Sequence, residues 1–122
     1  YNSVGMCDFV GIPIGSLKLK ALRDYVNAAT GWDMSLWELL KVGERANTMS
    51  RIFNLREGFS AADDQLPDRM FEPLQNGKLK GIGLDRQEVG EALELYYNMA
   101  GWGNNGVPTK AKLAELDLLW AA

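Results

Sequence analysis

Residues 43–69 read GERANTMSRIFNLREGFSAADDQLPDR, and the rest of the chain is organised around this stretch. With the residues just before it, the stretch predicts one long central helix over residues 36–56. Its apolar side chains recur at helical spacing, at Leu36, Leu39, Leu40, Ala46, Met49, Ser50 and Phe53. We therefore expect an all-α fold, an irregular multi-helix domain. In it this helix is the most buried, and its side chains Leu40 and Phe53 are covered by other elements.

A polar edge follows the same helix at the same spacing, through Glu44, Asn47, Arg51 and Asn54. Covered charges need partners, because an unpaired buried charge is very costly. Acidic partners are available at Glu57, Asp63 and Asp64. We expect a structural network that pairs the side chains of Glu44, Arg45, Arg51 and Arg56. The alternative is a catalytic cleft in which the adjacent carboxylates of Asp63 and Asp64 act as acid and base.

Glycine and capping residues delimit the other elements. Ser16 is placed to cap a helix over residues 17–30, which Gly31 ends. Asp33 or Ser35 precedes the central helix, and Gly58 follows it. Further capping residues precede three shorter predicted helices, at Ser60, Asp85 and Thr109, while Pro67 can open a short turn. Gly43 lies inside the central helix, where a glycine suggests close packing by another backbone or ring.

Composition restricts the function classes. The chain has 122 residues, 47% of them hydrophobic and 24% charged, with a net charge of −3. One domain of this size is expected, and an acidic balance argues against nucleic acid as a partner. No apolar run reaches membrane-spanning length. A single cysteine forbids an internal disulfide and favours a reducing, cytoplasmic setting.

Catalytic options within the chain are few. There is no histidine, so nucleophile pairs that use one are excluded. No phosphate-binding glycine loop is present. Cys7 follows Gly5 in an apolar, glycine-rich segment, residues 1–15, which reads as a loop. On composition alone, Cys7 is either a small buried side chain or a metal ligand. The segment begins abruptly at Tyr1, from which we expect a fragment of a longer protein.

Three motifs together resemble the C-terminal domain of the tungsten-containing aldehyde ferredoxin oxidoreductase family. Residues 43–69 follow the family pattern GER…R.FNLREGF…DD.LP.R. Residues 96–116, YYNMAGWGNNGVPTKAKLAEL, are similar to its C-terminal YY…GWD..G.PT…L..LGL, although Gly103 replaces the usual Asp and Asp117 the usual Gly. Residues 2–7, NSVGMC, resemble its motif D-x-x-G-L-C. The three motifs occur in the family's order and cover nearly the whole chain.

The resemblance implies cofactor roles for residues 1–15. Cys7 becomes one of four thiolates that hold a 4Fe-4S cluster, because thiolates are the usual ligands of such clusters. Asn2, Gly5, Met6 and Asp8 become cofactor-binding residues, with Asn2 at the position that contacts the pterin. Asn2 replaces the usual Asp, and its amide can accept a hydrogen bond but brings no charge.

The resemblance also implies partners that the chain lacks. The other three cluster cysteines, the N-terminal domain that binds tungstopterin or molybdopterin, and the middle domain would belong to the same parent protein. That parent would oxidise an aldehyde to a carboxylic acid and pass electrons to ferredoxin. Homo-oligomerisation is compatible with this interpretation. The isolated chain is expected to bind no cofactor and to be inactive.

Two alternatives remain open from the sequence. The chain could be a non-enzymatic helical interaction or scaffold domain whose apolar N-terminal loop docks a partner. It could also be a family member with altered or lost activity, for which Asn2 is the one indication. A clustered set of three cysteines and a pterin domain upstream in the parent would support the enzyme.

Overall fold

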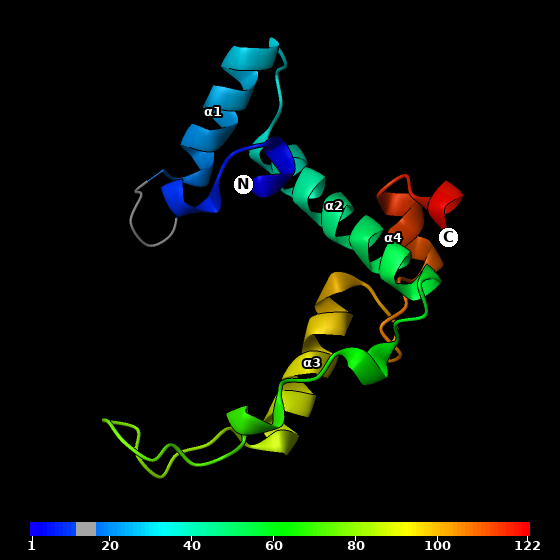
Figure 1. Ribbon diagram of the computed structural model, residues 1–122. Coiled ribbons are helices and arrows are strands. Elements are labelled where there is room, and N and C mark those ends of the chain that lie inside the picture. The colour runs from blue at the N-terminus through cyan, green and yellow to red at the C-terminus, as the bar shows by residue number, and fades with distance from the viewer. Residues whose placement is uncertain (12–16) are drawn as a thin grey trace.

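The computed structural model describes residues 1–11 and 17–122. It contains α1 (Leu19–Thr30), α2 (Leu36–Arg56), α3 (Arg86–Ala100) and α4 (Lys110–Glu115), joined by short 3-10 helices and turns. Within those residues no strand forms, and the one β-type contact is an isolated bridge between Trp102 and Pro108. The predicted all-α fold is confirmed (Figure 1).

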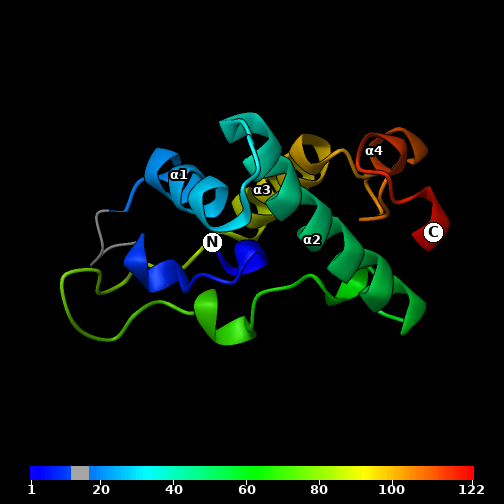
Figure 2. The ribbon, with the colours of Figure 1, turned by 90° about the horizontal axis from the view of Figure 1, so that it is seen from above.

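Helix α2 is the longest helix and lies between the other helices (Figure 1). Ser35 starts it with a capping box, since the Ser35 hydroxyl accepts from the Glu38 amide while the Glu38 carboxylate accepts from the Ser35 amide. Such a box satisfies two backbone donors that have no partner inside the helix. Seen from above, α1 lies near the first end of α2 and α4 beside its second half (Figure 2).

Two small apolar clusters form, one towards each end of α2. Leu39 and Leu22 of α1 are buried at the first end, where the 3-10 helix Asn2–Val4 also contacts α2. Ile52 is buried at the second end, against residues of α4 and the C-terminal turn Leu119–Ala121. The members of this second cluster are Ile52, Leu113, Leu116, Leu118 and Ala121.

The prediction of which face of the central helix is buried is wrong. Helix α2 does bury Leu39, Thr48, Arg51 and Ile52, yet Phe53 is 62% exposed and Leu40 is 50% exposed. Of the predicted apolar face this chain buries Leu39, but it leaves Leu40 and Phe53 uncovered. The prediction of close packing around Gly43 is also wrong, because no atom from outside its own helix backbone lies within 4 Å of the position that its Cβ would take.

The capping predictions succeed at most helix ends. Gly31 and Gly101 end α1 and α3 in the left-handed conformation, and the side chains of Asp85 and Thr109 cap α3 and α4. Helix α1 differs, because it starts at Leu19 after Lys18, which gives no side-chain cap. The predicted cap Ser16 lies outside the described residues.

Three more 3-10 helices occupy the connections, at Asp8–Val10, Ala61–Asp63 and Asp68–Met70. Ser60 was predicted as a capping residue, and it forms a capping box with Asp63. Pro67 precedes the turn Asp68–Met70. Residues 72–84 form an extended excursion that projects from the body (Figure 1). The Leu74 amide donates to the Ile82 carbonyl within it.

The molecule has an unusually large surface. Its accessible area is 9026 Å², whereas a compact monomer of 13.5 kDa would expose about 6,500 Å². Many large apolar side chains contribute, among them Trp37, Tyr25 and Met99. None of the described helices is long and apolar enough to span a membrane.

Candidate functional site

The residues predicted to contact cofactors lie on two consecutive turns at the start of the chain. Gly5 closes the 3-10 helix Asn2–Val4 with φ of 76°, a left-handed conformation that suits glycine. Cys7 then serves as the N-cap of the 3-10 helix Asp8–Val10. Asn2, Cys7 and Asp8 are each exposed on the surface.

Met6 is placed differently from its neighbours. It is half-buried and lines a hollow with Val4 and residues of α1. Its position anchors the turn that carries Cys7. The described residues contain no group of three or more histidine, cysteine or acidic side chains able to hold a metal ion. Cys7 is the one cysteine of the chain, so a cluster at this place would need its other ligands from elsewhere.

The N-terminal turns are fixed to the rest of the fold. The Tyr1 hydroxyl donates a hydrogen bond to the Leu17 carbonyl, and the Leu17 amide donates to the Val10 carbonyl at 3.2 Å. Ser3 and Val4 lie against α1 and α2 around a small hollow that also includes Gly43. The predicted loop is thus built of short helical turns, exposed at Phe9 and packed on α2 at its start. Its residues 12–15 lie outside the described residues.

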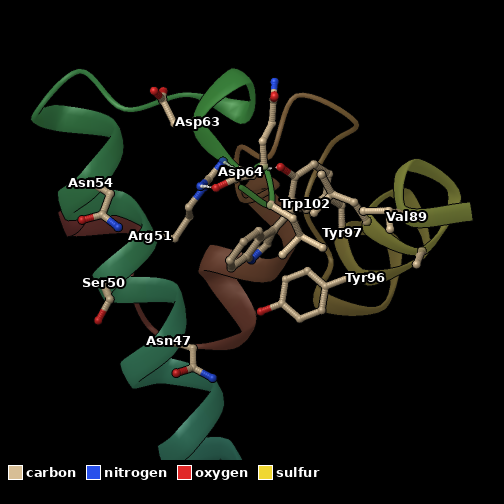
Figure 3. A pocket seen from close by; sticks show the side chains of 14 residues that line it. Asn47, Ser50, Arg51, Asn54, Asp63, Asp64, Val89, Tyr96, Tyr97 and Trp102 are labelled. Atoms are coloured by element: carbon tan, nitrogen blue, oxygen red, sulfur yellow. Dashed lines mark hydrogen bonds and ion pairs between the residues drawn. The ribbon is translucent and has the colours of Figure 1, made fainter. Parts of the chain in front are cut away.

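A second polar site joins four segments around Arg51 (Figure 3). The Arg51 side chain is 7% exposed. Its Nε donates to the Gly106 carbonyl at 2.8 Å, and Nη1 donates to Asp64 Oδ1 at 2.8 Å. Nη2 contacts Asp64 Oδ2 at 2.7 Å as an ion pair, although this contact lacks hydrogen-bond geometry. The Tyr97 hydroxyl donates to the same Oδ2.

Aromatic rings complete the surroundings of Arg51. Its guanidinium carbon lies 5.5 Å from the centroid of the Trp102 ring and 5.9 Å from that of Tyr97, within the range of cation–π attraction. Gly106 must be glycine here, because a Cβ would lie 2.2 Å from Arg51 Nη2 and its φ is 71°. The guanidinium is therefore enclosed by rings, a carboxylate and backbone.

The charges around Arg51 shift two pKa values. Burial raises the pKa of Asp64, but the hydrogen bonds from Arg51 and Tyr97 and the charge of Arg51 outweigh it, so the pKa lies below its ordinary value. Burial and the hydrogen bond to Asp64 raise the pKa of Tyr97. At neutral pH the site therefore holds an ionised carboxylate and a protonated phenol. Neither is poised to exchange a proton.

A closed ring of ion pairs ties α2 to α4. Lys112 contacts Glu44 at 2.5 Å and Glu115 at 2.7 Å, and Lys41 contacts the same two carboxylates. Hydrogen bonds from Lys112 and Lys41 lower the pKa of Glu115 to about 2. The same two lysines lower the pKa of Glu44. Networks of this kind are more effective than isolated surface pairs.

The predicted polar network is thus confirmed for Glu44 and Arg51, and the predicted pairing of Asp64 with an arginine is confirmed with it. It is wrong for Arg45 and Arg56, which are exposed and have no acidic or backbone partner for their side chains among the described residues. Asp63 accepts bonds from Ser60 as a cap rather than forming an acid–base pair with Asp64. The arrangement stabilises the fold and does not form a catalytic dyad.

Sequence reasoning missed the partners that come from distant segments. Tyr97, Trp102 and Gly106 all surround Arg51, but no spacing rule relates them to it. The available signal was the motif of residues 96–116, in which a tyrosine pair precedes the glycine-rich GWGNNG segment. A glycine that must allow close approach of a side chain is one reason for such a segment.

Comparison with known proteins covers nearly the whole chain. The family model described as "Aldehyde ferredoxin oxidoreductase, domains 2 & 3" matches residues 1–118. The tungsten-containing aldehyde ferredoxin oxidoreductase of Pyrococcus furiosus is 39% identical over 119 residues, and that of Thermococcus kodakarensis is 36% identical over 119 residues. Each alignment spans 96% of this chain and 19% of the relative.

Two more distant relatives have other activities in their names. The aliphatic sulfonate oxidoreductase, WOR-like subunit, of Pyrococcus furiosus is 28% identical over 124 residues. The active site complex BamBC of benzoyl coenzyme A reductase, solved with 1,5-dienoyl-CoA, superposes with a TM-score of 0.69 at 27% identity, over 84% of this chain and 14% of that chain. Because the family model spans almost every residue, this chain belongs to the aldehyde ferredoxin oxidoreductase family, in the part described as domains 2 and 3.

Proposed function

We propose that this chain is the C-terminal part of an aldehyde:ferredoxin oxidoreductase, present as a single helical domain of a longer parent polypeptide. The observation that carries the proposal is the family match over residues 1–118. The aldehyde-oxidising relatives are 36–39% identical, above the 28% of the sulfonate enzyme. The chain spans 19% of the length of these curated relatives, so the activity belongs to the parent.

The proposed reaction converts an aldehyde and water into a carboxylic acid, two protons and two electrons. A tungstopterin in the parent would supply the redox centre that takes the electron pair. A 4Fe-4S cluster in the parent would supply one-electron chemistry toward ferredoxin, with Cys7 as one of the residues that would hold it. Within this chain, residues 1–11 would hold and orient these groups, while α2 would keep those residues in a fixed position.

Cys7 is the residue we propose as a cluster ligand. Its thiol is exposed at the N-cap of a 3-10 turn, so a cluster could approach it without unfolding any helix. Thiolates are the normal ligands of iron–sulfur clusters, and Cys7 is the one cysteine of the chain. Three further thiolates would come from the rest of the parent.

Asn2 and its neighbours are proposed to contact the pterin side. Asn2 is exposed on the turn that Gly5 closes, five positions before Cys7 in the sequence. Its side-chain amide offers donors and an acceptor but no charge. Gly5 and Asp8 are also exposed, and Met6 lines a hollow against α1. This arrangement would place the pterin and the cluster close together.

The parent is proposed to work in a reducing cytoplasm, where a thiolate-ligated cluster is compatible with free cysteines. Its pterin-binding and middle domains, an aldehyde and ferredoxin are the proposed partners, and a homo-oligomer is compatible with this role.

The test is Cys7→Ser in the full-length parent protein. We expect loss of iron and of ferredoxin-linked aldehyde oxidation, with an unchanged far-UV circular dichroism spectrum because Cys7 is exposed and contributes little packing. Lys20→Ala, at an exposed position at the start of α1, is the matched control and should keep both iron and activity. Full iron content in Cys7→Ser would show that Cys7 is not a ligand.

One alternative follows from the large exposed apolar surface, namely a non-enzymatic interaction domain. The wild-type parent decides between the two. An enzyme of this family should be purified with tungsten or molybdenum and with iron, whereas a scaffold should contain none of these metals under the same conditions.

A further inference from the structure

A cleft of about 680 Å³ separates α2 from α3 (Figure 3). Its α2 wall is polar, with the side chains of Asn47, Ser50 and Asn54. Its α3 wall is mainly apolar and includes Val89, Ala92 and Leu93. Two walls of such different character suit an occupant that has both hydrogen-bonding and apolar groups.

One residue that lines the cleft has a buried donor without an acceptor. Trp102 lines the cleft and is 8% exposed, and its Nε1 is buried without a hydrogen-bond partner. Arg51 Nη2 is also buried without a hydrogen bond, although it contacts Asp64 as an ion. Buried donors in folded proteins are nearly always satisfied. The described residues supply no acceptor for this indole N–H, and because Nε1 has almost no accessible surface, it is not reached from the open cleft.

The charges at the cleft argue against an ionic occupant. Arg51 is neutralised by Asp64, and Asp63 is engaged by Ser60. Neutral amides also line the cleft, at Asn47, Asn54 and Gln65. Side-chain amides pair well with peptide groups, since they offer both donors and acceptors. The complementary partner is therefore an uncharged stretch of polypeptide.

The exposed area of this chain and the length of its relatives both allow a large partner. The accessible area of 9026 Å² exceeds the compact expectation of about 6,500 Å². The chain corresponds to 19% of each curated relative. Most of a relative's polypeptide therefore lies outside the aligned part and is available to cover the surface that this chain leaves open.

We propose that the α2–α3 cleft is an internal docking site for an uncharged segment of the parent polypeptide that lies outside these 122 residues. The segment places an apolar side chain against Val89 and Leu93 and pairs its backbone peptide groups with the side-chain amides of Asn47 and Asn54. This inference rests on the proposed function only in taking the chain as one part of a longer oxidoreductase.

The test compares two substitutions in neighbouring positions of α3 in the full-length parent. Ala92 lines the cleft, whereas Glu91 does not, and both are exposed in this chain. Ala92→Trp should displace the docked segment and speed amide hydrogen exchange in residues 86–100 by about tenfold or more. Glu91→Trp should leave exchange near the wild-type rate. Ala92→Leu replaces Ala92→Trp if that variant does not accumulate folded.

Equal exchange rates in the two variants and the wild type would overturn the inference, because a solvent-filled cleft accommodates an indole ring. Metal content and activity are measured separately. A parent without tungsten and iron in which Ala92→Trp still loosens α3 would refute the proposed function alone. A metal-loaded parent whose α3 exchange is unaffected by Ala92→Trp would refute the docking site alone.

Discussion

Replacing Gly106 with alanine tests the packing around Arg51 directly. Gly106 has φ of 71°, and an added Cβ would lie 2.2 Å from Arg51 Nη2 and 3.1 Å from Tyr97 Cζ. The methyl group cannot fit unless the guanidinium moves. The guanidinium is held by the Gly106 carbonyl and by Asp64, so its movement weakens the bonds to both.

The expected cost has two parts. An alanine in the left-handed region costs about 1 kcal/mol. Removing one partner of a buried ion pair costs about 3–5 kcal/mol. Here Arg51 is displaced rather than removed, and the Asp64 side chain is 28% exposed, so we expect about 1–2 kcal/mol from this part. The total of roughly 2–3 kcal/mol is a large share of the ~5–15 kcal/mol by which domains are stable.

Gly77→Ala provides the matched control. Gly77 has φ of 83°, and no atom lies within 4 Å of its Cβ position, so this variant measures the backbone strain alone. Equilibrium urea unfolding, followed by circular dichroism, should show a free energy of unfolding reduced by about 1 kcal/mol for Gly77→Ala and by clearly more for Gly106→Ala. Equal losses for the two variants would refute the steric argument.

Other predictions concern single residues. Asp117→Gly should raise the melting temperature, because Asp117 has φ of 55° and glycine relieves about 1 kcal/mol of strain there; an unchanged melting temperature would contradict this. The folded-state pKa of Asp64 lies below 3.8, so its stabilisation is complete above the unfolded value and is lost as the pH falls below it. Unfolding of the Asp64→Asn variant should therefore depend less on pH in the acid range. Burial and the hydrogen bond to Asp64 raise the pKa of Tyr97 above its ordinary value, so its contribution to stability should be fully present at neutral pH and be lost as the pH rises through the folded-state pKa in alkali. Ser35→Ala should cost about 1 kcal/mol through loss of the capping box, measured by thermal unfolding.

Local signals in the sequence predicted the helices well. The caps at Ser35, Asp85 and Thr109 act within three residues of the side chain concerned, so no tertiary information is needed to find them. The left-handed glycines at the ends of α1 and α3 are local for the same reason. Of the two candidate caps, Ser35 rather than Asp33 caps α2, because Ser35 exchanges hydrogen bonds with Glu38.

Burial could not be predicted in the same way. Periodicity shows that Leu40 and Phe53 are suited to an interface, but it does not say whether this chain or another part of the parent supplies the partner. The chain itself covers the side of α2 that includes Thr48 and Ile52. Gly43 led to the same error, because the close packing expected around it is absent among the described residues.

The candidate sites show the same limit. Pairing of Arg51 with Asp64 spans 13 residues and was foreseen from charge, whereas the bond from Tyr97 to Asp64 spans 33 and the bond from Arg51 to Gly106 spans 55. Contacts at those separations depend on how α3 and α4 return to α2. The role proposed for Cys7 came from family resemblance, and it stays a prediction until the variant is measured.

The length of α2 connects the turns that carry Cys7 with the site around Arg51. The N-terminal turns that carry Cys7 rest on its Leu39 end, while the guanidinium of Arg51 lies on the other half. Those two positions are twelve residues apart, or about 18 Å along a rigid rod. A rotation of α2 about one end therefore displaces the residues that pack at its other end. Misplacement of reacting groups by about 1 Å can slow a reaction 100-fold. The role proposed for Cys7 therefore predicts that substitutions near Arg51 slow the reaction of the parent protein from a distance.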